Sequence, residues 1–319
     1  MWKYLAKKLA QMLLMLLAIS FLIFAGLNMT GIDPVYYTVG MDNMDNTEAL
    51  ESVRERYGLD KPLVVRYFSW IGGILQGDFG YSLITGVPIS KTLQSRLFAT
   101  MELAMLALLL STIIGVSIGI ISAVWKNSVV DYLGRIFAVL GQSLPAYFVG
   151  ICLIEVFAIQ LGWLPTSGRL SIGDTTFMDR LDHIILPLAA MTMGMCAALM
   201  RFTRNNMLDV ATRDYVKTAR SKGIPEWKVY IKHVFRNGMR PVMVVVVMRL
   251  GMLIGGSVAI ESVFAWPGLG SELTSAITSG DYPIVMIITL LMASVILVAS
   301  FVVDIITAML DPRVRFEAK

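Results

Sequence analysis

Long apolar runs alternate with shorter polar segments along most of the chain. Each run is long enough to cross the roughly 30 Å of hydrocarbon in a bilayer, as a helix rising about 1.5 Å per residue. The pattern predicts an all-α polytopic membrane protein in which residues 1–319 form a single transmembrane domain. The expected transmembrane helices are six: 9–27, 98–125, 133–161, 184–200, 241–263 and 284–310.

Two prolines fall within the expected helices. Pro145 lies in the third run and Pro187 in the fourth. Each is expected to kink or delimit its helix, because proline removes a backbone donor. In the second run, Gly115 and Gly119 form a small-xxx-small pair, which permits two helices to approach closely.

The first run has a competing interpretation as a cleaved signal peptide, because it follows a short basic segment. It is longer than the apolar part of a typical signal peptide, and no small-x-small cleavage site follows it. A transmembrane helix is therefore favoured. The polar stretch 28–97 comes next, with an expected helix at 46–57 and an aromatic amphipathic piece at 63–75.

Composition supports the membrane interpretation. Hydrophobic residues make up 56% of the sequence and charged residues 16%, whereas soluble domains carry about 25% charged residues. The net charge of +4 is small and unevenly placed, so it does not indicate nucleic-acid binding. The cysteines, Cys152 and Cys196, lie in separate apolar runs, and neither they nor the histidines suggest a disulfide or a metal site.

Lysine and arginine are distributed unevenly among the polar segments. The N-terminal segment, the loop 126–135, the segment 201–240 and the C-terminal tail are basic, whereas 261–283 contains neither residue. By the positive-inside rule, the basic segments face the cytoplasm. The chain is therefore expected to be a multi-pass protein of the cytoplasmic membrane with both termini cytoplasmic and 28–97 external.

The segment 201–240 is the most basic part of the chain. Asp209–Lys222 is expected to form a helix that ends at Gly223, and Pro225 can open a second helix over Trp227–Asn237. The result is a helix–glycine–helix hairpin in the cytoplasm. Such a hairpin can dock on a protein partner, or it can rest on anionic lipid headgroups. The punctuation by glycine and proline favours docking, because a lipid-binding segment needs none.

The middle of this hairpin resembles the loop signature of ABC importer permeases, whose core is Glu-Ala-Ala, three residues and Gly. Ala219 and Gly223 match this core, whereas Lys217 and Thr218 replace its first two residues. The longer segment 214–223 is similar to the corresponding segment in the dipeptide, oligopeptide and nickel branch of the family. Further similar segments lie at 57–62, 77–82, 99–104, 143–145, 236–237, 263–270 and 311–313.

The resemblance implies a type I importer permease that imports short peptides by alternating access. In that family this loop forms a coupling helix that fits a groove on a cytoplasmic ATPase. The implied partners are a second, paralogous permease, two ATPase subunits and an extracytoplasmic substrate-binding protein, with ATP and Mg bound by the ATPases. The implied coupling residues are Asp214, Tyr215, Lys217, Thr218, Ala219, Arg220, Lys222, Gly223, Ile224 and Pro225.

Charged residues within or beside the apolar runs are candidates for a translocation pathway. A charge at mid-bilayer costs at least roughly 2.5–3.5 kcal/mol, so each should face a cavity or a partner. A peptide is zwitterionic, and Glu155 and Arg249 would suit its two ends. Structural pairing is the alternative and is favoured. The candidates are Glu102, Glu155, Arg249 and Asp304.

A stiff aromatic turn follows the fifth run on the expected external side. Phe264, Trp266, Pro267 and Gly268 are candidates for an external gate or for a contact with the binding protein. A re-entrant turn anchored at the interface by Trp266 is equally compatible with the pattern.

The chain contains no Gly-x-x-x-x-Gly-Lys-Ser/Thr loop and no paired-histidine or catalytic-serine motif. It is therefore expected to be a transport subunit without enzymatic activity, metal or cofactor of its own. Two alternatives remain open. One is an importer permease for nickel or a metal chelate, and the other is an ion-coupled secondary transporter, for which no internal repeat is visible.

Overall fold

The computed structural model describes residues 2–29, 61–171, 173 and 176–310, and these are helical apart from short connections. The order begins α1 (Trp2–Met29), α4 (Leu63–Leu75), α5 (Ile89–Val124), α6 (Val129–Ser143), α7 (Ala146–Leu153) and η2, a π-helical stretch (Ile154–Gln160). It continues α8 (Phe177–Ala211), α9 (Asp214–Ser221), α10 (Glu226–Val229), η3, also π-helical (Tyr230–Phe235), α11 (Arg236–Val263), α12 (Leu269–Ser279) and α13 (Tyr282–Leu310). The all-α expectation is confirmed, and the expected helix at 46–57 lies outside the described residues.

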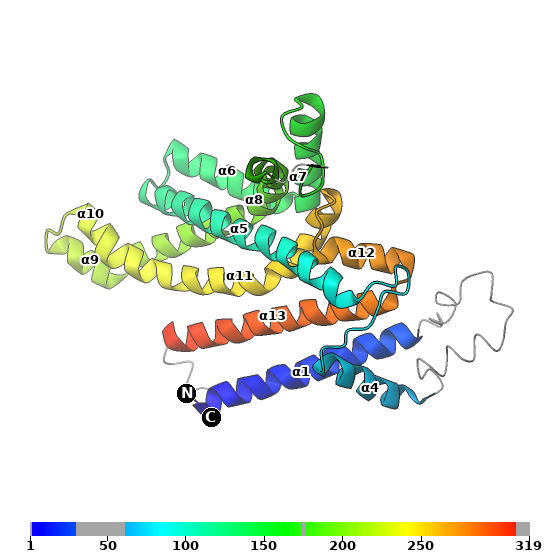
Figure 1. Cartoon of the computed structure of the whole chain (residues 1–319). Helices are drawn as coiled ribbons and strands as arrows, with labels where there is room; N and C mark the ends of the chain where they lie inside the picture. The colour runs from blue at the N-terminus through cyan, green and yellow to red at the C-terminus, as the bar shows by residue number, and fades with distance from the viewer. Residues whose placement is uncertain (1, 30–60, 172, 174–175, 311–319) are drawn as a thin grey trace.

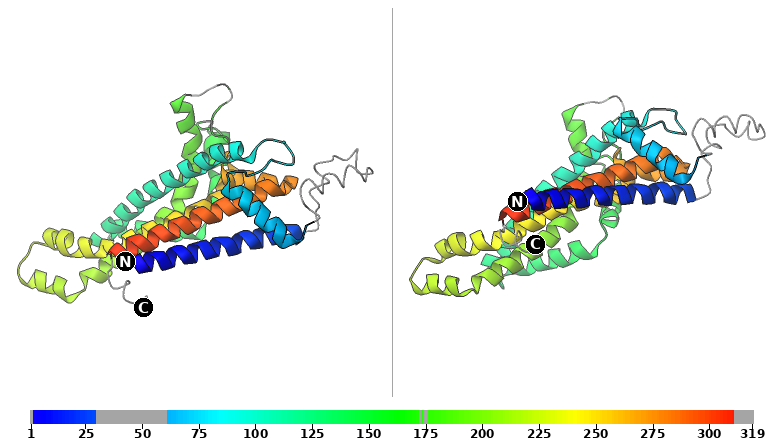
Figure 2. Two further views of the ribbon diagram at one scale, coloured as in Figure 1. Left: turned by 60° about the horizontal axis from the view of Figure 1, so that its bottom comes forward. Right: turned by 90° about the horizontal axis from the view of Figure 1, so that it is seen from below.

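The long helices form an elongated bundle (Figures 1 and 2). α1, α5, α11 and α13 run along its length, and α8 packs against α5, α6 and α11. We call the end where α9 and α10 project the hairpin end, and the opposite end, which carries α12, the far end (Figure 1). α1 begins and α13 ends toward the hairpin end.

Among the described residues, four helices are long and apolar enough to cross a membrane, or five if the bent pair α6 and α7–η2 counts as one span. The unbent spans are Leu5–Met29, Ile89–Val124, Phe177–Ala211 and Tyr282–Ile306. The remaining expected run, 241–263, lies inside the 28-residue helix α11. The apolar runs are therefore helical as expected, while the count of six is not confirmed.

The prolines behave differently from one another. Pro145 separates α6 from α7, and the two segments are bent by 102°, so the kink or break expected at Pro145 within the run 133–161 is confirmed. Pro187 lies inside α8 without ending it. Because α8 extends from Phe177 to Ala211, the fourth expected helix, 184–200, was also much too short at both ends. α8 packs against α5 and α6.

The expected glycine contact is confirmed between α5 and α8. A methyl group added at Gly115 would lie 2.7 Å from the Cys196 carbonyl oxygen, and one at Gly119 would lie 2.7 Å from that of Met200. Only glycine permits this approach, and it fixes the pair of helices that runs from the far end to the hairpin.

The first helix packs on two other elements. α1 contacts α13 and α4, and the Ser20 and Tyr67 hydroxyls are 2.7 Å apart across the α1–α4 contact. Tyr67 belongs to the expected aromatic piece at 63–75, which coincides with α4.

Candidate functional site

The basic segment forms the expected hairpin, with a different division into helices. α8 continues to Ala211, and α9 begins only at Asp214, so the single helix expected over Asp209–Lys222 is interrupted at Thr212 and Arg213. The second arm runs through α10 and η3 directly into α11. The hairpin is therefore continuous with two bundle helices, one for each arm.

Gly223 makes the turn between the two arms. Its φ is +73°, a left-handed conformation that side chains with a Cβ rarely adopt. The Gly223 N–H donates to the Arg220 carbonyl at 2.9 Å, which closes the end of α9. Pro225 directly precedes α10, so both punctuating residues act at the expected positions, although Pro225 lies just outside the second helix.

The inside of the hairpin is a small apolar cluster. Val216, Val229 and Val234 are fully buried, and Ala219 is nearly so, beside Met207 of α8. Ala219 is buried in this cluster, so a larger side chain would have to displace its neighbours. The hairpin tip is thus held together by apolar packing against the C-terminal part of α8.

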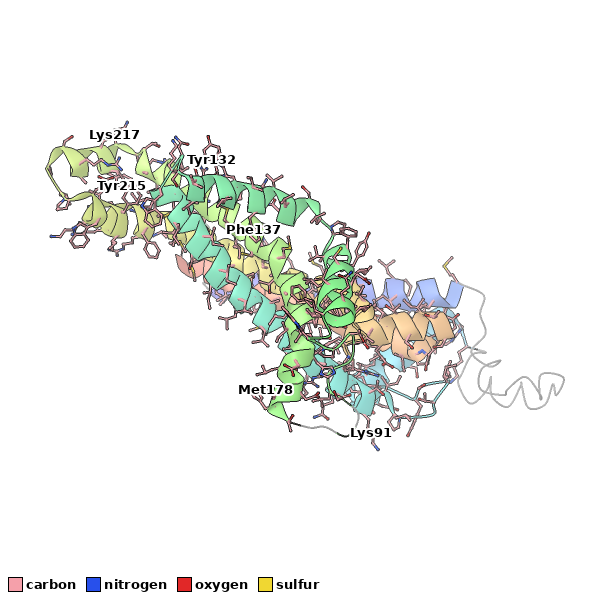
Figure 3. The ribbon with its side chains drawn as sticks, turned by 90° about the horizontal axis from the view of Figure 1, so that it is seen from above. Lys91, Tyr132, Phe137, Met178, Tyr215 and Lys217 are labelled. Carbon is pink, nitrogen blue, oxygen red and sulfur yellow. The ribbon has the colours of Figure 1, made fainter. Side chains whose placement is uncertain are left out.

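The outside of the hairpin is charged and open to solvent. The side chains of Asp214 and Lys217 are 96% and 65% exposed and form an ion pair at 2.9 Å. The hydrogen bond from Lys217 lowers the pKa of the Asp214 carboxyl. Tyr215 and Lys217 mark this surface at the tip in Figure 3. Such side chains are free to meet a partner without any unfolding.

A second ion pair bridges the two arms. Arg220 Nη2 lies 2.7 Å from Glu226 Oε1, and Arg220 Nη1 donates to the Ala211 carbonyl at 3.2 Å. The bond to Glu226 raises the pKa of Arg220. The Thr218 hydroxyl donates back to the Asp214 carbonyl within α9, whereas Lys222 is exposed and Ile224 packs on the apolar cluster.

The predicted gate residues lie at the far end, in the turn between α11 and α12. Trp266 is 0% exposed, and its indole N–H donates to the Ala99 carbonyl at 2.9 Å. Phe264 is also buried, and its carbonyl accepts from Gly168 N–H at 2.8 Å. In this conformation neither ring has a surface for a binding protein. The turn is a packed part of the core, so Trp266 is not an exposed interfacial anchor either.

A buried carboxylate organises this turn. Glu261 is 0% exposed and accepts hydrogen bonds from Thr100 Oγ1 at 2.8 Å and from the N–H groups of Gly270 and Ser271 at 2.7 and 3.2 Å. It therefore caps the start of α12 and joins it to α5. A methyl group added at Gly268 would lie only 2.4 Å from the carboxyl carbon of Glu261, so glycine is required there.

Sequence reasoning did not select Glu261. It was seen only as part of a loop without lysine or arginine. The available signal was an acidic residue at the end of an apolar run, followed by two glycines and a serine that can bring backbone N–H groups close.

The other end of α12 is fixed in a similar way. Asp281 is almost fully buried and accepts from Ser82 Oγ at 2.5 Å and from Leu83 N–H at 3.2 Å. Between the two ends, Glu272 forms an ion pair with Arg96 of α5 at 2.8 Å. Polar contacts at both ends and in the middle of α12 thus attach it to α5 and to the loop that precedes α5.

Glu102 is paired with arginines. Arg169 Nη2 lies 2.6 Å from Glu102 Oε2, and Arg180 of α8 contacts the other oxygen. The Arg169 guanidinium also lies 5.8 Å from the Trp266 ring centroid. Two predicted sites, Glu102 and the aromatic turn, are therefore joined through Arg169, and structural pairing accounts for this carboxylate.

The other pathway candidates do not meet. Glu155 is exposed on η2, where Gln160 Nε2 donates to it at 3.1 Å. Arg249 Nη1 donates to the Met195 carbonyl of α8 at 3.1 Å. Asp304 forms an ion pair with Lys8 at 2.9 Å, which joins α13 to α1. No contact between Glu155 and Arg249 is found among the described residues.

A further buried carboxylate lies near the hairpin end. Asp131 is 0% exposed, and Arg204 Nε and Nη2 donate to its two oxygens at 2.6 and 2.8 Å. Ser122 Oγ and Asn127 N–H donate at 2.5 and 2.9 Å. This cluster joins α5, α6 and α8 where the hairpin emerges. No group of three or more potential metal ligands occurs in the described part of the chain.

Solved structures support the fold. An amino acid ABC transporter superposes with a TM-score of 0.55 at 14% identity, covering 68% of this chain and 93% of that one. An inward-facing structure of the MetNI methionine ABC transporter gives 0.55 at 16% identity, covering 70% and 98%. This similarity agrees with the type I importer permease fold that the resemblance implied.

Relatives of similar length share more of the sequence. A Brucella suis protein named as a peptide permease is 38% identical over 304 residues, 94% of this chain and 95% of its own. The Escherichia coli K12 glutathione transport system permease protein GsiC is 36% identical over 317 residues, 99% and 100%. Two family models match the chain. The model of the binding-protein-dependent transport system inner membrane component matches residues 115–316. The model of the N-terminal part of the membrane component of such systems matches residues 1–104. The chain belongs to the family of binding-protein-dependent transport system inner membrane components.

Proposed function

We propose that this chain is the permease subunit of an ATP-driven ABC importer that carries short peptides across the cytoplasmic membrane. Two ATPase subunits, a second and paralogous permease, and an extracytoplasmic binding protein complete the assembly, with ATP and Mg bound by the ATPases. The observation that carries the proposal is the hairpin, whose apolar residues pack inward while its charged residues face solvent.

The hairpin suits a docking role because its tip is already folded. Ala219 and Val216 are buried within it, so a partner would meet Tyr215, Lys217 and Lys222 on a preformed surface. Little ordering is then required on binding, which favours affinity. Its arms continue into α8 and α11, so a displacement of the tip reaches the bundle directly.

The orientation follows from charge. The hairpin, both termini and the loop 126–135 are basic, so by the positive-inside rule we assign them to the cytoplasm and residues 28–97 and the far end to the outside. Transport by alternating access would open the far end when the ATPases close on ATP, and hydrolysis would reset the bundle. The contacts of Glu102 with Arg169 and Arg180 join three segments at that end and would separate during opening.

The substrate class rests on the relatives, which are named as peptide and glutathione permeases. A zwitterionic peptide needs both an acid and a base along its path, and we assign these roles to Glu155 and Arg249. Alanine at either position should lower peptide uptake by folded, assembled importer while ATP hydrolysis continues. Uptake equal to wild type in both variants would remove these residues from the pathway.

The coupling role is tested at Gly223. In Gly223→Asp, the tip should fail to assemble with the ATPases, or ATP hydrolysis should continue without peptide uptake. Gly162→Asp is the matched control, because Gly162 has a similar φ of +63° and open space around it, but lies beyond η2. Assembly, hydrolysis and uptake are measured on reconstituted complexes. Normal coupling in Gly223→Asp would contradict the docking role.

A further inference from the structure

A hollow lies between the end of α5 and the second arm of the hairpin. Its volume is about 550 Å³. Both sides contribute apolar and aromatic surface, and the single acidic lining residue, Glu226, is already paired with Arg220. The hollow is lined by Val124, Trp125, Glu226, Trp227, Tyr230 and Ile231.

The position of the hollow along α5 corresponds to a membrane surface. Glu102 is the charged residue of α5 that lies nearest to the hairpin end. The uncharged, apolar stretch 103–124 follows it. At about 1.5 Å per residue this stretch spans roughly 33 Å, close to the thickness of the hydrocarbon layer. α5 ends at Val124, so Trp125 and the hollow lie where hydrocarbon gives way to headgroups.

The exposed surface of the hollow is unsuited to water. Trp125 is 57% exposed and Trp227 62% exposed, and Ile231 beside them is as open as Trp227. Tryptophan is enriched at the membrane interface, because its ring is apolar while its N–H can meet water or headgroups. Two such rings from segments far apart in the sequence therefore form one interfacial site.

Basic residues stand at the rim of this apolar surface. Lys126 directly follows Trp125, and the Lys228 ammonium lies 5.3 Å from the Trp227 ring centroid. Lys232, also exposed, follows on the same arm. Since Glu226 is neutralised by Arg220, the uncompensated charge around the hollow is positive, which favours an anionic headgroup.

The backbone of the second arm is unusual at this place. α10 gives way to the π-helical stretch η3 at Tyr230, and Tyr230 and Ile231 both line the hollow. π-Helical segments are rare and are frequent at functional sites, because the wider turn redirects side chains.

We propose that this hollow binds an anionic phospholipid from the leaflet on the hairpin side. One acyl chain lies between Trp125 and Trp227, and the phosphate meets Lys126 and Lys228. The lipid then contacts a transmembrane helix and the coupling hairpin at once, so the lipid composition influences how the hairpin is held. The proposed function supplies the name of the leaflet, the cytoplasmic one, but binding itself requires no transport.

The experiment measures lipid retention by the whole importer complex. Complexes are assembled in nanodiscs of phosphatidylcholine with phosphatidylglycerol, extracted into detergent, and analysed by native mass spectrometry for bound lipid. Wild type should retain phosphatidylglycerol in preference to phosphatidylcholine. Lys228→Gln should weaken that retention roughly fivefold, the effect of one basic residue near an anionic surface, and Trp227→Ala should weaken the retention of both lipids.

Matched controls keep the outcome interpretable. Trp163→Ala removes a similarly exposed tryptophan from the loop after η2 and should leave retention unchanged, and Lys228→Arg should preserve it. Variants are compared only after they elute with their ATPase subunits, which shows that they fold. Unchanged retention in both Lys228→Gln and Trp227→Ala would overturn the proposal, as would equal retention of the two lipids by wild type. Protection of a Trp227→Cys thiol by ATPase subunits in lipid-free detergent would show a protein interface instead.

Discussion

The far end and the hairpin tip use charge in opposite ways. At the far end, Glu261 and Asp281 are buried and accept hydrogen bonds from backbone N–H groups and hydroxyls. At the hairpin tip, Asp214 and Lys217 point into solvent, and the interior is made of valine and alanine. Buried carboxylates fix a single geometry, because an unpaired buried group is costly. An exposed charged surface over an apolar interior leaves recognition open to a partner.

This contrast predicts the largest stability effect at Glu261. In Glu261→Ala, the Thr100 hydroxyl and the N–H groups of Gly270 and Ser271 lose their acceptor. At about 1–3 kcal/mol for each unsatisfied group and allowing for relaxation, the free energy of unfolding should fall by about 3–5 kcal/mol. The midpoint of thermal unfolding in detergent measures it. Glu155→Ala, at an exposed glutamate, serves as control, and equal shifts in the two variants would refute the buried cap.

A second variant tests the same turn through packing. Gly268→Ala would bring a methyl group against the Glu261 carboxylate, and overpacking should cost about 1–3 kcal/mol. Gly255→Ala adds the same methyl group where nothing lies within 4 Å. That control should be neutral or slightly stabilising, since alanine favours a helix over glycine by about 1 kcal/mol. A Gly268→Ala protein as stable as its control would mean that the turn is loosely held.

At the hairpin the expected stability effect is smaller and the functional effect larger. Arg220→Gln removes an ion pair that is partly open to solvent, so the free energy of unfolding should change by less than about 1 kcal/mol. Retention of ATPase subunits on affinity purification should nevertheless fall, because the ion pair between Arg220 and Glu226 no longer holds the two arms in register. A loss of thermal stability in Arg220→Gln together with normal retention of the ATPase subunits would contradict the contrast between the far end and the hairpin tip.

The smallest effect concerns pH. The Asp214 carboxyl has a pKa below its ordinary 3.8 because Lys217 donates to it. Its stabilising contribution is therefore present above pH 3.8 and is lost as the pH falls through the lower, folded-state pKa. The difference in unfolding midpoint between wild type and Asp214→Asn should shrink in that acidic range. A difference that grows on acidification would show that Lys217 is not the partner.

Features with a local cause were predictable from the sequence. The apolar runs, the turn at Gly223 and the break at Pro145 each follow from residues that lie together in the chain. Pro187 shows the limit of this reasoning, because α8 continues past it. Whether a proline ends a helix depends on neighbouring helices that can satisfy the freed backbone groups, and those neighbours are not visible locally.

Features built from distant segments were not predictable. Glu261 meets Thr100, Asp131 meets Arg204, and Glu102 meets Arg169 and Arg180. Each partner is remote in sequence. The apolar pattern therefore shows that burying the charge costs free energy, but it does not show which residue compensates the charge. The same limit applied to Trp266, for which the sequence allowed a gate, a binding-protein contact or an interfacial anchor, and which is buried with its indole N–H bonded to the Ala99 carbonyl.

The second arm of the hairpin has a mechanical consequence. From Glu226 through η3 and α11 to Val263 the chain is one uninterrupted helix, roughly 55 Å long at about 1.5 Å per residue. Arg249, well inside this rod, is tied to the Met195 carbonyl of α8. A sideways displacement at Glu226 would therefore be passed along this helix to the Arg249 contact and, beyond it, toward Glu261. Glu261 in turn carries the start of α12, so a displacement at the hairpin end would reach the turn at the far end through one continuous helix.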